Sequence, residues 1–179
     1  GNRYLELIPQ GEAATSIDEE DLLPALSLAW EMRAGMKLRG SWSRTIARPT
    51  FRELAPVATE EFIFGDEFIG NPDLTLSSIT NIDLRWEWFG KDGAMVAVSL
   101  FEKDLRDPIE YLSFFASNRN FIQPVNYEAG RVDGVELEGR LPMELLVKWL
   151  EGLTLTSNYT QIDSEVDVPA VEYETLDTN

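Results

Sequence analysis

Hydrophobic and polar residues alternate with a period of two along much of this chain. Residues 81–89 show the pattern most clearly, with apolar Ile82, Leu84, Trp86 and Trp88 alternating with charged Asp83, Arg85 and Glu87. This period is that of a β-strand with one apolar and one polar face. Such a strand needs either a protein core or a lipid bilayer to cover its apolar face.

The same alternation recurs on both sides of this segment. It appears in the stretches LLPALSLAWEMR, MKLRGSWSRT, GAMVAVSLFEKDL, GVELEGRL and LTLTSNYT, and less completely in RYLELIP near the start. Helical periodicity is scarce. The pattern therefore predicts an all-β fold, an antiparallel up-and-down meander of about seven strands. Several of these strands reach about ten residues, which is the length a tilted strand needs to cross a bilayer.

The connections between the predicted strands alternate between short and long. Tight turns are predicted near Arg33 to Gly35 and at Gly90 to Gly93, and the stretch PMELLVKWLEG has room for one or two helical turns. Long stretches separate the strands at residues 46–78 and 106–124, and the long, polar stretch QGEAATSIDEED follows the first predicted strand. Short turns at one end and long loops at the other are typical of outer-membrane barrels. The alternation therefore favours a segment of a large transmembrane β-barrel.

A soluble β-sandwich, such as a carbohydrate-binding module, is the alternative. It has the same alternation, but its apolar faces meet one another about 10 Å apart in a closed core. The aromatic residues Trp30, Trp42, Trp86, Trp88 and Tyr159 fall on the apolar side of the predicted strands. In a barrel they would form interfacial belts; in a sandwich they would fill the core.

Composition removes several classes of function. The net charge of −17 argues against a nucleic acid partner. The chain has no Cys and no His, which excludes disulfides, thiolate metal sites and the commonest general base. The chain contains no run of 18 apolar residues, so the sequence does not predict a transmembrane helix. We expect no enzymatic activity and no catalytic, cofactor-binding or metal-binding residues.

The polar faces and the loops supply candidate binding residues. In a barrel, the polar face would line a wet lumen and pair across strands, through Arg39, Asp83, Arg85, Glu87, Glu136 and Glu138. The long loops combine acids with the aromatic residues Phe62, Phe64, Phe68, Tyr111, Phe114 and Phe115. Exposed aromatics beside carboxylates suit a small-molecule or oligosaccharide ligand. The alternative is that these aromatics only pack the loops against each other.

Several ordered blocks resemble the C-terminal barrel half of TonB-dependent outer-membrane receptors. The most specific are SRTIARPTFRELAP at 43–56, GNPDL at 70–74 and NIDLRWEWF at 81–89, and the similarity runs from about Leu22 to Val166. The resemblance implies a barrel of about 22 strands, plugged by an N-terminal domain. It also implies a place in the bacterial outer membrane and import of a siderophore, cobalamin or oligosaccharide, driven by TonB.

The resemblance implies that residues 1–179 form only part of such a barrel domain. The plug, the segment that engages the TonB complex and the remaining strands are not recognisable in this sequence. A barrel segment alone has two unpaired edge strands and a bare apolar face toward the outer-membrane lipid. We therefore expect the isolated chain to cover this face by curling on itself or by pairing with another copy.

Overall fold

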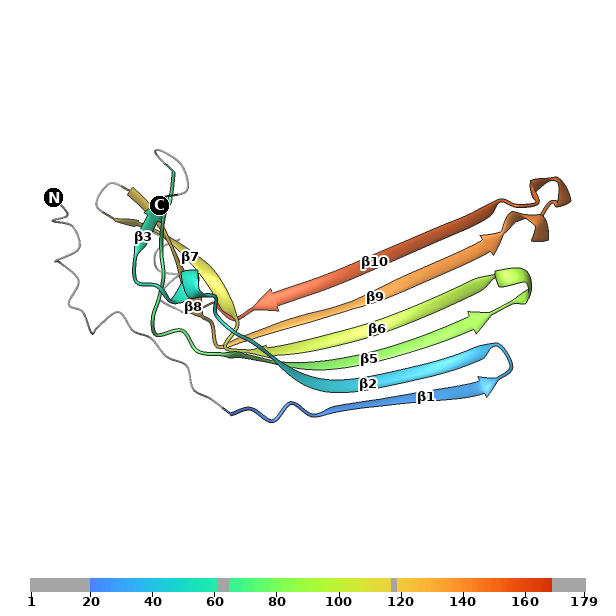
Figure 1. The fold of residues 1–179 in the computed structure, drawn as a ribbon, viewed down its shortest axis with the longest axis horizontal. Coiled ribbons are helices and arrows are strands. Elements are labelled where there is room, and N and C mark those ends of the chain that lie inside the picture. Colours follow the sequence, from blue (N-terminus) through green and yellow to red (C-terminus); the bar gives the residue numbers. More distant parts are fainter. Residues whose placement is uncertain (1–19, 61–64, 117–118, 169–179) are drawn as a thin grey trace.

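The computed structural model describes residues 20–60, 65–116 and 119–168. The strand expected in RYLELIP and the candidate residues Phe62 and Phe64 lie outside the described residues. Six long strands form the main sheet: β1 (Ala25–Arg33), β2 (Met36–Ala47), β5 (Ser77–Phe89), β6 (Met95–Arg106), β9 (Ala129–Pro142) and β10 (Thr154–Val166). They lie side by side in the order β1-β2-β5-β6-β9-β10, each antiparallel to its neighbours (Figure 1). The predicted meander is confirmed, as an open sheet.

Three short connections link neighbouring long strands at one end of the main sheet, as predicted. Gly35, at φ +78°, makes the β1–β2 turn, and a Cβ there would lie 2.6 Å from the Phe89 carbonyl oxygen. The Phe89 N–H donates to the Gly35 carbonyl oxygen at 2.7 Å, so this turn is tied to the end of β5. A 3₁₀ turn at Lys91–Gly93 joins β5 to β6, and two more, Met143–Leu145 and Lys148–Leu150, join β9 to β10. Glycine at Gly35 permits the positive φ and the close backbone approach.

The long connections contain a second sheet that the sequence did not predict. Strands β3 (Ala58–Glu60), β4 (Glu67–Ile69), β7 (Ile109–Ala116) and β8 (Arg119–Asn126) lie in the order β3-β4-β8-β7. Strands β7 and β8 form a hairpin between β6 and β9, within the long stretch expected over 106–124. The two loops fold together beyond one end of the long strands (Figure 1). We call α1 (Phe51–Leu54) together with β3, β4, β7 and β8 the loop body.

The buried residues do not lie between two sheets. Leu74, Ser77, Pro124 and Tyr127 are buried where the loop body meets the long strands. Large apolar side chains of the long strands are exposed instead, including Leu28 at 72% and Leu84 at 44%. The sandwich alternative is therefore wrong, because its apolar faces would meet and bury one another. The residues that the structure describes do not curl to cover this surface either; pairing with another copy stays a prediction.

Candidate functional site

The strand register sorts the side chains of the long strands onto two faces. The apolar face carries Leu26, Leu28, Trp30, Leu38, Trp42, Ile82, Leu84, Trp86, Trp88, Val96, Val98, Leu100, Val135, Leu137, Leu155 and Tyr159. The opposite face, called the ion-pair face below, carries the six charged residues predicted to act together: Arg39, Asp83, Arg85, Glu87, Glu136 and Glu138. The register thus confirms that these six share one face.

Arg85 is the centre of a hydrogen-bonded ion network on the ion-pair face. Its Nη1 and Nη2 donate to the two carboxylate oxygens of Glu138 at 2.7 and 3.1 Å, and its Nε donates to Glu87 Oε1 at 3.0 Å. Arg39 Nε donates to the other oxygen of Glu87 at 2.9 Å, and Ser99 Oγ accepts from Arg85 at 2.8 Å. The network therefore crosses β2, β5, β6 and β9 and pairs four of the six residues, Arg39, Arg85, Glu87 and Glu138, while their place in a lumen stays a prediction.

Arg85 binds both carboxylate oxygens of Glu138, an arrangement called the forked contact below. Its loss should therefore reduce the stability of the sheet more than the loss of any other member of the network. We expect Arg85→Ala to lower the free energy of unfolding of the full-length protein by about 2 kcal/mol, since charge-assisted hydrogen bonds each contribute ~1.5–3 kcal/mol and these groups are partly exposed. Arg140→Ala is the matched control, because Arg140 is exposed on the same face without an ion pair to any residue that the structure describes. Denaturant unfolding measures both.

A double-mutant cycle separates the pair from its surroundings. Combining Arg85→Ala with Glu138→Gln should cost less than the sum of the two single changes, because each single change already removes the forked contact. A coupling energy of about 1–2 kcal/mol is expected for residues in one network. Strict additivity of the two changes would show that the forked contact does not stabilise the sheet.

The aromatic residues of the apolar face cluster in the register rows near the short turns. Trp30, Trp86 and Tyr159 stand in one row, on β1, β5 and β10. Trp88 follows one row nearer the turns, whereas Trp42 lies nearer the loop body. Trp30 and Tyr159 are each 57% exposed. Indole and phenol rings are typical of a lipid-facing surface near its aqueous boundary, so the cluster indicates that such a boundary lies on the turn side of the apolar face.

The polar margin of the apolar face crosses the strands obliquely. The row of Ile82 holds apolar Leu26 and Trp42 toward β1, but acidic residues toward β10, namely Glu102, Asp133 and Asp163. The next row toward the turns is apolar or glycine as far as Val135 and becomes polar only at Gln161. The apolar surface therefore shifts toward the turns from β1 to β10. Strands tilted against a flat boundary produce this shift.

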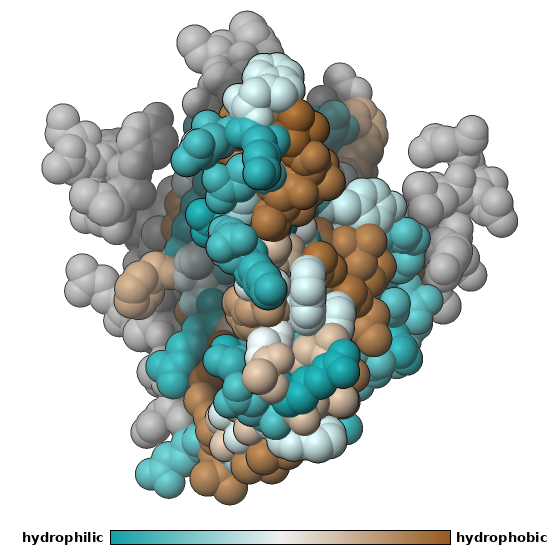
Figure 2. Space-filling model, turned by 90° about the vertical axis from the view of Figure 1, so that its right-hand side faces the viewer, coloured by the Kyte–Doolittle hydropathy of each residue, from teal (hydrophilic) through white to brown (hydrophobic). Residues whose placement is uncertain are grey.

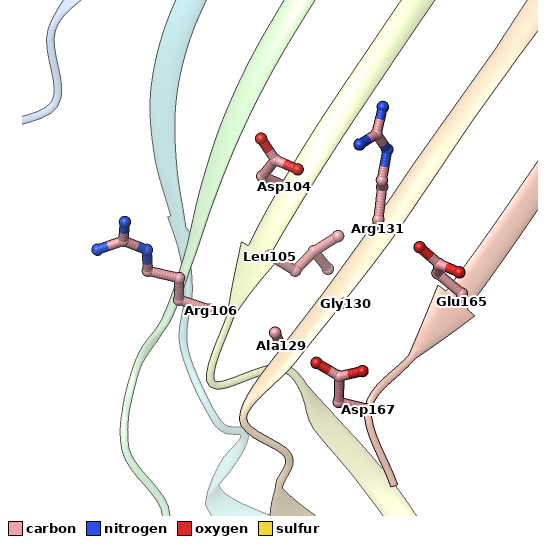
Figure 3. Close-up of a pocket in the computed structure, with 8 residues that line it drawn as sticks. All are labelled: Asp104, Leu105, Arg106, Ala129, Gly130, Arg131, Glu165 and Asp167. Atoms are coloured by element: carbon pink, nitrogen blue, oxygen red, sulfur yellow. The ribbon is translucent and has the colours of Figure 1, made fainter.

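A cavity of about 340 Å³ lies at this polar margin, near the loop end of β6, β9 and β10 (Figure 3). Asp104, Arg131 and Glu165 line it from one register row, on the same side of the sheet as Leu100. Arg131 also pairs with Glu102 at 3.0 Å and Asp133 at 3.5 Å. The cavity is thus a charged depression outside the ion-pair face. In the part of the chain that the structure describes, no cluster of acidic residues is arranged to hold a metal ion.

Backbone pairing and asparagine side chains join the two long loops into the loop body. Strand β4 pairs in parallel with β8, placing Phe68 opposite Ile122. Asn71 Nδ2 donates to the Pro124 carbonyl oxygen at 3.1 Å. Asn126 Oδ1 accepts from the Thr75 N–H at 2.8 Å, while its Nδ2 donates to the Asp107 carbonyl oxygen at 2.7 Å. These contacts fix the β2–β5 loop to the β6–β9 connection.

A second set of contacts ties α1 to the loop sheet. Thr50 caps the helix in a capping box with Glu53, and the Tyr111 hydroxyl donates to Glu53 Oε1 at 2.6 Å. Burial raises the pKa of Glu53, but the hydrogen bonds from Tyr111 and Thr50 outweigh it and hold that pKa below its ordinary value. The same bond to Glu53, with burial, raises the pKa of Tyr111. The guanidinium carbon of Arg52, Cζ, lies 4.4 Å from the centre of the Phe68 ring.

Several of the predicted loop aromatics pack against other aromatic rings. The rings of Phe68 and Tyr111 meet edge to face, with their centroids 6.0 Å apart, and the rings of Phe114 and Phe121 stack with their centroids 5.5 Å apart. Phe115 is 69% exposed. The structure therefore places all four described candidates in the loop sheet, where Tyr111, at 57%, is exposed as well as Phe115. Sequence reasoning missed Asn71 and Asn126, whose side chains join the loops.

In the described residues, no helix is long and apolar enough to cross a membrane. A family model described as "TonB dependent receptor-like, beta-barrel" matches residues 5–178. Among solved structures, the chain is similar to the siderophore receptor PirA from Pseudomonas aeruginosa, with a TM-score of 0.62 and 19% identity over 79% of this chain and 25% of that one. The chain is also similar to a mutant of the ferric enterobactin receptor PfeA from the same organism, in complex with enterobactin. The TM-score is 0.59 and the sequence identity 21%, over 78% of this chain and 22% of that one.

PirA from Acinetobacter baumannii gives a TM-score of 0.56 and 18% identity, over 78% of this chain and 22% of that one. No curated protein sequence matches the chain. The chain thus spans a quarter or less of the length of these solved receptors, at 25% and 22%. At these identities the likeness shows the fold, and it agrees with an open sheet that forms part of a larger structure.

Proposed function

Since this chain belongs to the TonB-dependent receptor β-barrel family, we propose that it forms part of an outer-membrane receptor that binds a scarce ligand and imports it with energy from the TonB complex. Residues 1–179 then form part of the barrel domain, while the plug and the remaining strands come from other parts of the receptor. Alone, the chain would leave the edges of β1 and β10 unpaired, and we expect it to associate with another copy.

The exposed apolar face is the observation that carries this proposal. Leu28 and Leu84 share a register row and are 72% and 44% exposed, which is costly in water and favourable against lipid. The ion-pair face then lines the lumen, so that Arg39, Asp83, Arg85, Glu87, Glu136 and Glu138 meet water and the plug. The loop body lies on the outside of the cell, and the short turns lie in the periplasm.

The loop body is the proposed place of first contact with the ligand. Its candidate contact residues are Phe68, Tyr111, Phe114 and Phe115, and the candidates Phe62 and Phe64, which lie outside the described residues, stay predictions. Phe115 is the strongest of the described ones, because it is more exposed than Tyr111 and Phe114, which also pack against other rings. The charged cavity of Figure 3 is a weaker candidate, since it opens on the apolar side of the sheet.

A ferric siderophore is the first ligand to test, with cobalamin and oligosaccharides as alternatives. The support is the naming of the similar structures, which are siderophore and ferric enterobactin receptors. The test measures import of each ligand class by cells with and without the receptor gene, together with outer-membrane fractionation. A heat-modifiable protein in the outer-membrane fraction and loss of import of one class are expected. A receptor found in the soluble fraction would overturn the proposal.

A single aromatic substitution tests the loop contact. Phe115→Ala should weaken ligand binding about three- to tenfold, because one aromatic contact contributes ~0.5–1.5 kcal/mol. Phe51→Ala is the control, since Phe51 is 94% exposed on α1 of the same loop body and is not a candidate contact. Titration of the purified receptor with the imported ligand gives both dissociation constants. Equal dissociation constants for Phe115→Ala and the unchanged receptor would remove Phe115 from the site.

A further inference from the structure

The β9–β10 turn differs in character from the other two short turns of the main sheet. The β1–β2 turn consists of Ala34 and Gly35, and the β5–β6 turn carries the charged Lys91 and Asp92. Residues 143–153, between β9 and β10, instead carry five exposed apolar side chains: Leu145, Leu146, Val147, Trp149 and Leu153. A connection that faced only periplasmic water would not need so much apolar surface.

This apolar surface is open over the whole turn. Trp149 is 81% exposed, Leu146 63% and Leu153 54%. Figure 2 views the turn end of the molecule and shows hydrophobic residues gathered in its upper part, where Figure 1 places this turn. No part of the described chain covers these side chains.

Much of the backbone of the turn is hydrogen-bonded within the turn. The Met143 N–H donates to the Leu153 carbonyl oxygen at 2.8 Å, which closes the turn at its base. The Val147 N–H donates to Met143 and the Leu150 N–H to Val147, at 2.9 and 3.0 Å. A segment that enters a membrane boundary must pair its own backbone groups, because few water molecules are available there. The two 3₁₀ turns, Met143–Leu145 and Lys148–Leu150, meet much of this requirement.

The turn is continuous with the apolar face. Leu141 and Leu155 are register partners on that face, directly before and after the turn. The apolar surface shifts toward the turns from β1 to β10, so at β9 and β10 it reaches the end of the strands. A boundary that crosses the strands obliquely therefore meets the sheet at this turn, while the charged β5–β6 turn remains beyond it.

We propose that the β9–β10 turn is a membrane anchor, with Trp149 and the neighbouring leucines inserted at the periplasmic headgroup boundary of the bilayer. This rests on the proposed function, which makes the apolar face lipid-facing. Trp is suited to this boundary, and the Lys148 ammonium can reach lipid phosphates. The plug is a poorer occupant, because it would contact the ion-pair face rather than a continuation of the apolar face.

Spin labelling of the full-length receptor in lipid vesicles tests the anchor. Residues 1–179 contain no Cys, so a thiol label introduced in this segment has no native thiol of the segment to compete with, and any Cys elsewhere in the receptor is first replaced by Ser. Single labels are placed through Trp149→Cys, through Asp92→Cys in the polar turn as the matched control, and through Leu84→Cys in the middle of the apolar face. Collision rates with oxygen, which partitions into lipid, and with a water-soluble nickel chelate report the surroundings of each label.

We expect the oxygen-to-nickel collision ratio to be several-fold higher at position 149 than at position 92, and highest at position 84. A ratio at 149 equal to that at 92 overturns the anchor but leaves the proposed function standing. A label at 149 that is immobile and shielded from both reagents also overturns it, in favour of a protein occupant. A label at 84 that meets the nickel chelate freely contradicts the proposed function itself.

Discussion

The Leu84→Arg variant of the full-length receptor is expected to lose about 2–4 kcal/mol of folding free energy in a bilayer, the cost of an arginine on the lipid face near the membrane midplane. Leu84 stands in the middle of the apolar run of β5, between Ile82 and Trp86, and is 44% exposed. No described side chain on this face offers a carboxylate in the same register row, which holds Leu28, Gly40, Leu100, Val135 and Gln161. The new guanidinium would therefore enter lipid with no carboxylate in its own row, and Glu102 in the next row is already paired with Arg131 at 3.0 Å.

Ser41→Arg is the matched control for Leu84→Arg. Ser41 lies one register row away on the ion-pair face, where its hydroxyl donates to Asp83 Oδ2 at 3.1 Å. An arginine there would face the lumen and could pair with Asp83, so a change within about 0.5 kcal/mol is expected. Denaturant titration of receptor folded into vesicles measures both variants. Equal losses for the two would show that the faces do not differ in their surroundings, and the lipid assignment would fail.

The main sheet could be predicted from the sequence because its determinants are local. The alternation of Ile82, Leu84, Trp86 and Trp88 with charged residues defines both faces of β5 without knowledge of its neighbours. Gly35 and the segment 90–93 mark the turns that set the register of the hairpins. Once the register is fixed, residues such as Arg39 and Arg85 must share a face.

The contacts that organise the loops could not be predicted, because they are non-local. The parallel pairing of β4 with β8 joins segments more than fifty residues apart, such as Phe68 and Ile122, and neither segment has a pattern that names its partner. The β7–β8 hairpin was not predicted either, although a stretch of that length without secondary structure is uncommon in an ordered domain. The choice of Glu138 as the partner of Arg85 likewise depends on the register of three strands.

Gly70 shows how such a non-local contact constrains one residue. It is buried, and a Cβ added there would lie 2.1 Å from the Ala55 carbonyl oxygen and 2.7 Å from that of Arg52. The next residue, Asn71, donates its N–H to the Glu53 carbonyl oxygen at 2.6 Å. Two backbone segments thus approach each other closely, with no flexible side chain between them to move aside. The GNPDL block begins at this point, and glycine is needed there for lack of space.

Gly70→Ala is therefore expected to separate α1 from the loop sheet, at a local cost of about 3 kcal/mol, the upper end of what overpacking usually costs. Hydrogen exchange should become faster in β4 and at Asn71 to Thr75, while β5 and β6 keep their protection, because their ladder does not depend on the loop contact. Gly139→Ala is the control, since nothing lies within 4 Å of a Cβ built there. If the loop body is the ligand's first contact, Gly70→Ala also weakens ligand binding and Gly139→Ala does not. Unchanged exchange in β4 of Gly70→Ala would show that the two loops are not joined at this point in solution.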